Sequence, residues 1–436
     1  MTIHALKNLS SALLLLARDL LETSREREVP LSGPALATPF SNISEADWAE
    51  AVRLWNAQGR SLIPGLAQRD CPACGAAEGR SLFESYDGYP YVECDLCGCW
   101  YVPLRVEAGI FDAFFVRCPE ARAVAERSYA ARETPEYAEA CLGRIGGYLD
   151  VLLPLATGEG PGRTLDVGCG LGHSLKAASD RGLIAMGTES SSDCIRIARA
   201  NGLDVRDAAE PLPSGPFRLI TFWESLEHMS DPYGVLVECR SRLEANGLVA
   251  FSVPNLLSPL LRLQRADCSV VHGGYDTPGH INLLGPESLR RLLDRSGYAL
   301  LDLDGQYGLN FVELLAYAAG LHRGAHDLLV GRREVQGVPE STIEVLRWTG
   351  PALAIVERIA LLSPILVGIA CRKEAAEGFR EGIGRLQKAR KARLVAEIEA
   401  NVPPPSRGER TYARIQSVFH VLRDPAGAIT RLFRRK

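Results

Sequence analysis

Long apolar runs are missing from this sequence. Nowhere in its 436 residues do about 18 to 20 apolar residues follow one another, the length that a membrane-spanning helix needs. The apolar stretch at residues 12–17 is interrupted by Arg18 and Asp19 and lacks the preceding basic region of a secretory signal. We expect residues 3–22 to form an amphipathic helix, with a targeting segment as the alternative, and we expect a cytoplasmic protein. No internal repeat is present.

The composition is that of a globular protein, with 46% apolar and 23% charged residues. The length allows two or more domains of roughly 100–200 residues each. A formal net charge of −4 conceals a basic C-terminal segment, which from residue 372 onward holds 16 Lys and Arg against seven Asp and Glu. Such a segment can dock on the acidic remainder of the chain or contact an anionic surface, membrane lipid included. We expect docking, because apolar residues recur at helical spacing at Phe379, Ile383, Leu386, Leu394 and Ile398.

Cysteines number twelve, and without an export signal they are expected to be reduced thiols. Four of them form two Cys-x-x-Cys-Gly pairs separated by 19 residues, namely Cys71, Cys74, Cys94 and Cys97. Four thiolates on two tight turns provide a closed tetrahedral shell for Zn²⁺. The spacing therefore predicts a zinc ribbon with a structural metal. A ribbon without metal and redox-active cysteines are the alternatives.

A glycine-rich loop carries the strongest functional signal. A short apolar strand ends in Asp166, glycines follow at 168, 170 and 172, and a helix is expected to begin near His173. Glycine permits a ligand to approach the backbone, and the N–H groups of the following helix favour an anionic group. A dinucleotide site would need a glycine at the position of His173. The carboxylate of Asp166 would repel a pyrophosphate, but it suits a ligand that carries an ammonium and a sulfonium, such as S-adenosylmethionine.

Further strands follow the loop in order, at residues 184–189, 203–207, 217–224, 247–254, 299–304 and 365–373. The fourth strand precedes a Leu-Glu-His-x-x-Asp-Pro block at residues 226–232. With the acid-x-Gly-x-Gly-x-Gly loop, this succession resembles the class I S-adenosylmethionine-dependent methyltransferases, although Arg218 stands where the family usually has Asp. The resemblance implies an α/β fold, a Rossmann-like seven-stranded methyltransferase sheet with an N-terminal zinc ribbon and helical additions.

The resemblance also implies the donor-binding residues. Glu189 falls where the family places the carboxylate that accepts both ribose hydroxyls, and Asp207 or Ala208 would lie beside the adenine. The complete predicted set comprises Asp166, Gly168, Gly170, Gly172, His173, Glu189, Ser190, Asp207, Ala208, Trp223 and Glu224.

The candidates for acceptor chemistry lie in two segments. Glu224, Glu227 and His228 would share one face if their segment were helical. His280 follows the fifth strand, and a neutral imidazole is suited to accept a hydroxyl proton near pH 7. We predict catalytic roles for His280, His228 and Glu224. Hydrogen bonds that shape the loops, or a divalent cation as in some quinol-type members, are the alternatives, and His272 is a weaker candidate.

The predicted organisation has five parts: a helical leader at 1–66, the zinc ribbon at 67–105, a helical connector or lid at 106–160, the methyltransferase domain at 161–374 with a helical insertion at 307–364, and a basic helical tail at 375–436. The ribbon-first layout resembles bacterial methyltransferases of sugars and secondary metabolites. It implies methyl transfer to a hydroxyl, or to an activated carbon, of a small or sugar-like acceptor.

Two other functions stay open at this point. A methyltransferase of RNA or another macromolecule would use the ribbon and the basic tail for binding. Residues 69–105 have few basic side chains, and the Asn/Asp-Pro-Pro-Tyr/Phe motif of many base-modifying enzymes is missing after the fourth strand, so nucleic acid is disfavoured. A binding protein without activity is disfavoured by the intact glycine loop and Glu189.

Overall fold

The computed structural model describes residues 45–85, 88–106, 109–158, 160–264, 279–306, 356–358 and 360–401. The expected helix at 3–22, His272, most of the insertion at 307–364 and the chain beyond 401 lie outside these residues. Within the described part, no helix has the length and apolar character needed to cross a membrane.

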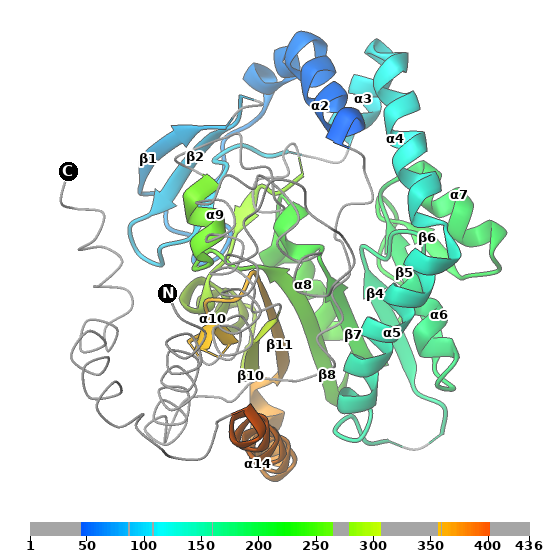
Figure 1. The fold of residues 1–436 in the computed structure, drawn as a ribbon, viewed down its shortest axis with the longest axis vertical. Coiled ribbons are helices and arrows are strands. Elements are labelled where there is room, and N and C mark those ends of the chain that lie inside the picture. Colours follow the sequence, from blue (N-terminus) through cyan, green and yellow to red (C-terminus); the bar gives the residue numbers. More distant parts are fainter. Residues whose placement is uncertain are drawn as a thin grey trace, which may run out of the picture.

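A seven-stranded sheet forms the centre of the molecule (Figure 1). Its strands are β4 (Arg163–Val167), β5 (Ile184–Glu189), β6 (Val205–Asp207), β7 (Phe217–Trp223), β8 (Leu243–Pro254), β10 (Tyr298–Gln306) and β11 (Ile365–Arg372). The order is β10-β11-β8-β7-β4-β5-β6, and β11 runs antiparallel to both of its neighbours. The Rossmann-like fold class is therefore confirmed, and all seven expected strands are present.

Alternate residues of the sheet feed two separate apolar cores, as the two-residue period of a strand requires. Val249 and Phe251 of β8 pack on the side of α8 (Pro232–Arg242) and α10 (Pro286–Arg295). Leu248 and Ala250 pack on the opposite side with α5 (Pro135–Leu152), α6 (His173–Ser179) and α14 (Ala376–Asn401). All seven residues of β7 are buried, because both faces of this strand are covered. Helix α7 (Ser192–Ala200) packs against α6 and β6.

The ribbon forms a second sheet with four antiparallel strands in the order β1-β2-β3-β9. Strands β1 (Gly79–Glu84), β2 (Pro90–Cys94) and β3 (Trp100–Tyr101) belong to the ribbon. Strand β9 (Asn282–Leu283) comes from the loop after β8. The ribbon is thus joined by backbone pairing to a segment that begins two residues after His280.

An aromatic core links the ribbon to the preceding helices. Trp55, 1% exposed, lies between Tyr89 of the ribbon and Phe114 of α3 (Gly109–Arg117). Helix α2 (Glu45–Leu54), a π-helical turn at Trp55–Gly59, a 3₁₀ turn at Arg60–Gly65 and α4 (Pro119–Arg132) complete this region, and α9 (Pro259–Gln264) is a short helix after β8. The helices expected between ribbon and sheet are present as α3, α4 and α5.

The first part of the basic C-terminal segment, helix α14, docks on the sheet. Phe379 and Ile383 are buried in the core beside α5, as their spacing predicted. Arg390 forms a buried ion pair with Asp302 of β10, and Gln387 Nε2 donates to Asp302 Oδ1 at 3.2 Å. The side chains of Leu394 and Ile398 lie outside the described atoms.

Candidate functional site

The three loop glycines after β4 all have positive φ, but the space beside them differs. A Cβ on Gly168 would lie 2.7 Å from Ser225 Cβ, and one on Gly172 would lie 2.3 Å from Leu203 Cδ1. A Cβ on Gly170, at φ +54°, would meet nothing within 4 Å. The outer two glycines are therefore required by packing within the protein, whereas Gly170 borders open space that a ligand can fill.

The buried carboxylate of Asp166, at the start of this loop, bonds to the neighbouring elements. The side chain is 3% exposed, and its carboxylate accepts hydrogen bonds from Ser174 Oγ of α6 and from Thr221 Oγ1 of β7, the latter at 2.7 Å. Burial raises the pKa of Asp166 to about 6, against these two hydrogen bonds, which favour the charged form. The carboxylate therefore links three elements at the carboxyl edge of the sheet. Neither hydroxyl partner was foreseen, although Ser174 lies only eight residues away.

Glu189, at the end of β5, is fixed by three backbone N–H groups. Its Oε2 accepts from Gly170 N at 2.8 Å, and its Oε1 accepts from Ser190 N at 2.8 Å and Ser191 N at 2.9 Å. Ala208 N donates to the backbone oxygen of Glu189 at 2.8 Å, which places Ala208 and the exposed Asp207 beside it. The structure thus brings these predicted donor-site residues together.

His173 and Trp223 connect the loop region to the helices before β4. His173 Nε2 lies 3.3 Å from the backbone oxygen of Arg132, and burial lowers the pKa of this imidazole. Trp223 stacks on Tyr148 of α5 with 5.1 Å between ring centroids, and Tyr148 OH donates to Gln306 at 2.9 Å. The connector helices α4 and α5 therefore contact both ends of the predicted donor site.

Two carboxyl groups with buried oxygen atoms follow β7. Glu224 adopts φ +51°, a strained conformation for a non-glycine residue, and its Oε1 has no hydrogen-bond partner within the described residues. Glu227 is fully buried, and among the described residues neither of its carboxyl oxygens has a hydrogen-bond partner, although Oε1 lies 3.9 Å from His228 Nε2. Burial raises the pKa of both side chains, and the charge of Glu224 raises that of Glu227 further.

The expectation that Glu224, Glu227 and His228 share a helical face is wrong. Leu226–His228 is a single 3₁₀ turn, and Glu224 lies before it in a left-handed conformation that turns the chain away from β7. The electrostatic coupling of the two glutamates comes from this turn rather than from helical periodicity.

His228 and His280 lie together although 51 residues separate them in the chain. Their ring centroids are 4.8 Å apart, and His228 Nδ1 lies 2.8 Å from the backbone oxygen of Gly279. A carbonyl only accepts, so Nδ1 carries the proton and Nε2 presents a lone pair in the neutral ring. One ligand atom from each of Glu227, His228 and His280 falls within 4.8 Å of the other two. The cluster can therefore transfer a proton or hold a cation.

The four ribbon cysteines converge as their spacing predicted. Cys71 Sγ lies 3.6 Å from Cys97 Sγ, and Cys74 Sγ lies 3.4 Å from Cys94 Sγ. Tetrahedral zinc with Zn–S bonds of about 2.3 Å separates its sulfur ligands by roughly 3.8 Å. Gly75 and Gly98 have φ of +76° and +69°, and each donates its N–H to the first cysteine of its pair at 2.8 and 2.9 Å. The cluster is compatible with zinc.

Comparison with known proteins agrees with this geometry. Residues 141–303 match the family of methyltransferase domains. The ubiquinone biosynthesis O-methyltransferase of Methylococcus capsulatus is 31% identical over 161 residues, which are 34% of this chain and 67% of that protein. Its counterpart from Idiomarina loihiensis is 26% identical over 156 residues, 33% of this chain and 64% of that protein, so the chain spans less than two thirds of its length.

A solved S-adenosylmethionine-dependent methyltransferase from Archaeoglobus fulgidus is 20% identical, with a TM-score of 0.34, over 52% of this chain and 93% of that one. The matched residues 141–303 contain the glycine loop, Glu189 and the block after β7, so the sequence matches and the site describe the same part of the molecule. The chain belongs to the S-adenosylmethionine-dependent methyltransferases.

Proposed function

We propose that this enzyme transfers the methyl group of S-adenosylmethionine to a hydroxyl group of a small acceptor, with His280 as the general base. The observation that carries the proposal is the cluster of Glu227, His228 and His280 at the carboxyl edge of the sheet, where ligands bind in open α/β folds. The name of the matched relatives, O-methyltransferases of ubiquinone biosynthesis, supports a hydroxyl acceptor. A sugar hydroxyl and an activated carbon are finer alternatives.

The residues around the glycine loop and Glu189 fit S-adenosylmethionine, the methyl donor of the family. Gly170 leaves room for a ligand at the loop, and the carboxylate of Glu189 is oriented by three N–H groups, of which Oε2 accepts only one and so keeps a lone pair for a ribose hydroxyl. Asp207 and Ala208 would border the adenine. Gly168, Gly172, His173, Ser190, Trp223 and Glu224 would complete the donor site. Bound S-adenosylmethionine supplies an electrophilic methyl group, and the chain supplies alignment.

On the acceptor side, an imidazole would take the hydroxyl proton. His280 is 9% exposed and contacts the more exposed ring of His228, so a proton can leave through the His228 side. Burial raises the pKa of both Glu227 and Glu224, and these side chains would shape the acceptor site rather than take the proton. The same cluster also suits a divalent cation, which would be the second candidate role for its side chains.

In the ribbon, we propose a structural zinc ion on Cys71, Cys74, Cys94 and Cys97. Four protein ligands leave no open position for catalysis, so the metal would stabilise the fold of the ribbon.

The test pairs a donor-binding measurement with a turnover assay. Calorimetry with S-adenosylhomocysteine should show binding to the wild type and equal binding to His280→Gln. Methyl transfer to 3,4-dihydroxybenzoate, a phenolic probe, and to UDP-glucose, a sugar probe, should separate the acceptor classes. On the accepted probe, His280→Gln should lower kcat by about 100-fold or more, the usual contribution of a general base.

The control variant is Lys176→Gln, on the exposed side of α6. It should leave binding and turnover unchanged. Full turnover of His280→Gln would refute the general-base role, and loss of activity with EDTA that Mg²⁺ restores would favour the cation role instead.

A further inference from the structure

We propose that the ribbon is a working part of the acceptor site, and that Arg69 and Asn282 are positioning residues that hold Glu227, His228 and His280 in place. This inference rests on the proposed function for the roles of those three side chains. It assigns to the ribbon a task beyond metal binding.

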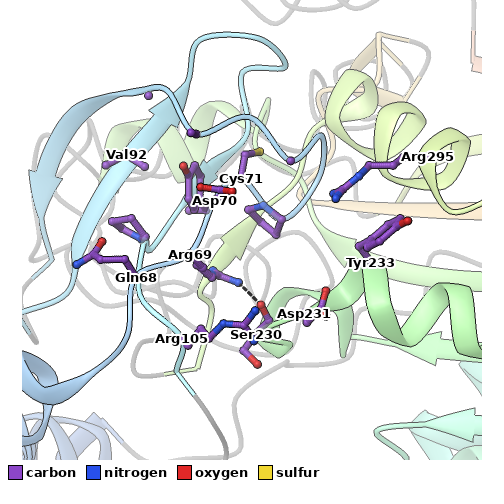
Figure 2. Close-up of a pocket in the computed structure, with 16 residues that line it drawn as sticks. Gln68, Arg69, Asp70, Cys71, Val92, Arg105, Ser230, Asp231, Tyr233 and Arg295 are labelled. Carbon is purple, nitrogen blue, oxygen red and sulfur yellow. Dashed lines mark hydrogen bonds between the residues drawn. The ribbon is translucent and has the colours of Figure 1, made fainter.

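Arg69 spans the junction between ribbon and methyltransferase domain (Figure 2). Its Nε donates to the backbone oxygen of Val102 at 2.9 Å, on the ribbon side. Its Nη1 donates to the backbone oxygens of Ser230 at 2.8 Å and Met229 at 3.4 Å, directly after the 3₁₀ turn that carries Glu227 and His228. Its Nη2 donates to the backbone oxygen of Ile281 at 3.0 Å and to Asn282 Oδ1 at 2.7 Å, directly after His280. One guanidinium therefore bonds the ribbon and both acceptor segments.

Asn282 continues this network inside the protein. It is fully buried, and its Nδ2 donates to the backbone oxygens of Leu226 at 2.9 Å and Met229 at 2.8 Å. These two carbonyls flank Glu227 and His228. The amide thus fixes the turn from one side while its oxygen is held by Arg69.

Backbone contacts of the ribbon reach the same segment. Tyr91 OH donates to the backbone oxygen of His280, and Val102 N donates to that of Ile281 at 3.0 Å. Ile281 N in turn donates to the backbone oxygen of Glu227 at 2.9 Å. The pairing of β3 with β9 continues this ladder. The histidine segment is therefore held between the ribbon and the 3₁₀ turn.

The chemistry of these contacts requires an arginine. Every group that accepts from Arg69 is a neutral oxygen, and the acceptors lie around a planar fork with five donors, which the single ammonium of lysine does not match. None of these contacts involves the glycine loop or Glu189. Weakening the network should therefore displace the acceptor groups and leave donor binding intact.

Arg69→Lys and Asn282→Asp test the inference. Arg105→Lys is the matched control, because Arg105 lines the same cavity of about 570 Å³ beside Arg69 in Figure 2 but has no side-chain hydrogen bond to either segment within the described residues. The measurements are zinc content, calorimetry with S-adenosylhomocysteine, and imidazole resonances of isotope-labelled histidines. The resonances are assigned with His280→Gln, His228→Gln and His173→Gln variants.

Both test variants should keep zinc and donor affinity, shift or broaden the resonances of His228 and His280, and leave that of His173 unchanged. With the methylated probe, kcat should fall by about 100-fold, the scale expected for a displacement near 1 Å. The control should match the wild type in all four readouts.

Wild-type resonances of His228 and His280 in both variants would overturn the inference, whether or not either probe is methylated. Parallel loss of zinc, donor affinity and the His173 signal in both variants would also overturn it, since it would show that the two residues support the whole fold rather than the acceptor groups. If Arg69→Lys does not fold, Asn282→Asp decides alone. Absence of wild-type methylation would contradict only the proposed function.

Discussion

Asp166 is a buried carboxyl group whose charge state changes within an accessible pH range. Burial raises its pKa from 3.8 to about 6, so the group is mostly protonated below pH 6 and negative above it. A negative charge at this point would favour the ammonium of the donor. Affinity for S-adenosylhomocysteine should therefore increase as pH rises through about 6, and fall roughly tenfold at one pH unit below that pKa.

Calorimetry between pH 5 and pH 8 measures this effect, and Asp166→Asn provides the control with no titrating group at the position. The variant should bind with a nearly constant, weaker affinity over the range. A wild-type affinity independent of pH would show that Asp166 acts only by holding Ser174 and Thr221. The sign for stability is opposite: the native state binds this proton more tightly than the unfolded chain, so the contribution of Asp166 to stability falls as pH rises between 3.8 and 6.

Individual residues differed in how far the sequence could predict them. Gly170 and Glu189 lie within local motifs, and the structure places them together because their strands are neighbours in a parallel sheet. Arg69 has no such local signal, because its partners lie about 160 and 212 positions further along the chain. The contact between His228 and His280 is of the same kind: each was named as a candidate, but their proximity depends on the loop after β8.

Among the elements, the buried strands were the most predictable. β7 is apolar and covered on both faces, so burial leaves a continuous signal in its sequence. The helical face expected after β7 is not present, because the left-handed Glu224 and a single 3₁₀ turn leave no periodic pattern in the sequence. Strand β9 was not predicted, since two residues that pair with a distant ribbon are too short to show a pattern.

Helix α14 offers a prediction about the basic segment. Arg390 is 4% exposed and Asp302 is fully buried, so Arg390→Met would leave a buried carboxylate without its cation. The free energy of unfolding should fall by about 3 kcal/mol or more. A second change, Asp302→Asn, should restore most of this loss because it removes the charge. Urea denaturation measures each step of this double-mutant cycle.

The control for this cycle is Arg385→Met, whose exposed pair with Glu381 should contribute less than about 0.5 kcal/mol. Equal stability of Arg390→Met and the wild type would show that α14 is not anchored through this pair.

At the scale of the whole molecule, the ribbon and the methyltransferase domain share a sheet edge and an apolar core. Cys71, Cys97 and Tyr101 of the ribbon pack in one cluster with Leu236 of α8 and Leu289 of α10. The sequence divides these parts at about residue 105, yet the fold joins them through β9. Domain boundaries drawn from motifs alone therefore miss the coupling between them.

Removal of the proposed zinc ion should expose this coupling. A structural zinc site contributes about 10–16 kcal/mol of binding free energy, so the two cysteine turns of the ribbon should not stay folded without metal. Cys74→Ser, or the wild type after chelation, should lose the ribbon and with it the support of His280, while β4, β5 and the glycine loop continue to bind S-adenosylhomocysteine. Calorimetric melting should then show a separate transition at lower temperature, and methylation of the accepted probe should cease. Zn²⁺ but not Mg²⁺ should restore the chelated wild type, because thiolate ligands bind Zn²⁺ and Mg²⁺ prefers oxygen ligands. An unchanged melting profile after metal loss would contradict a structural role for zinc.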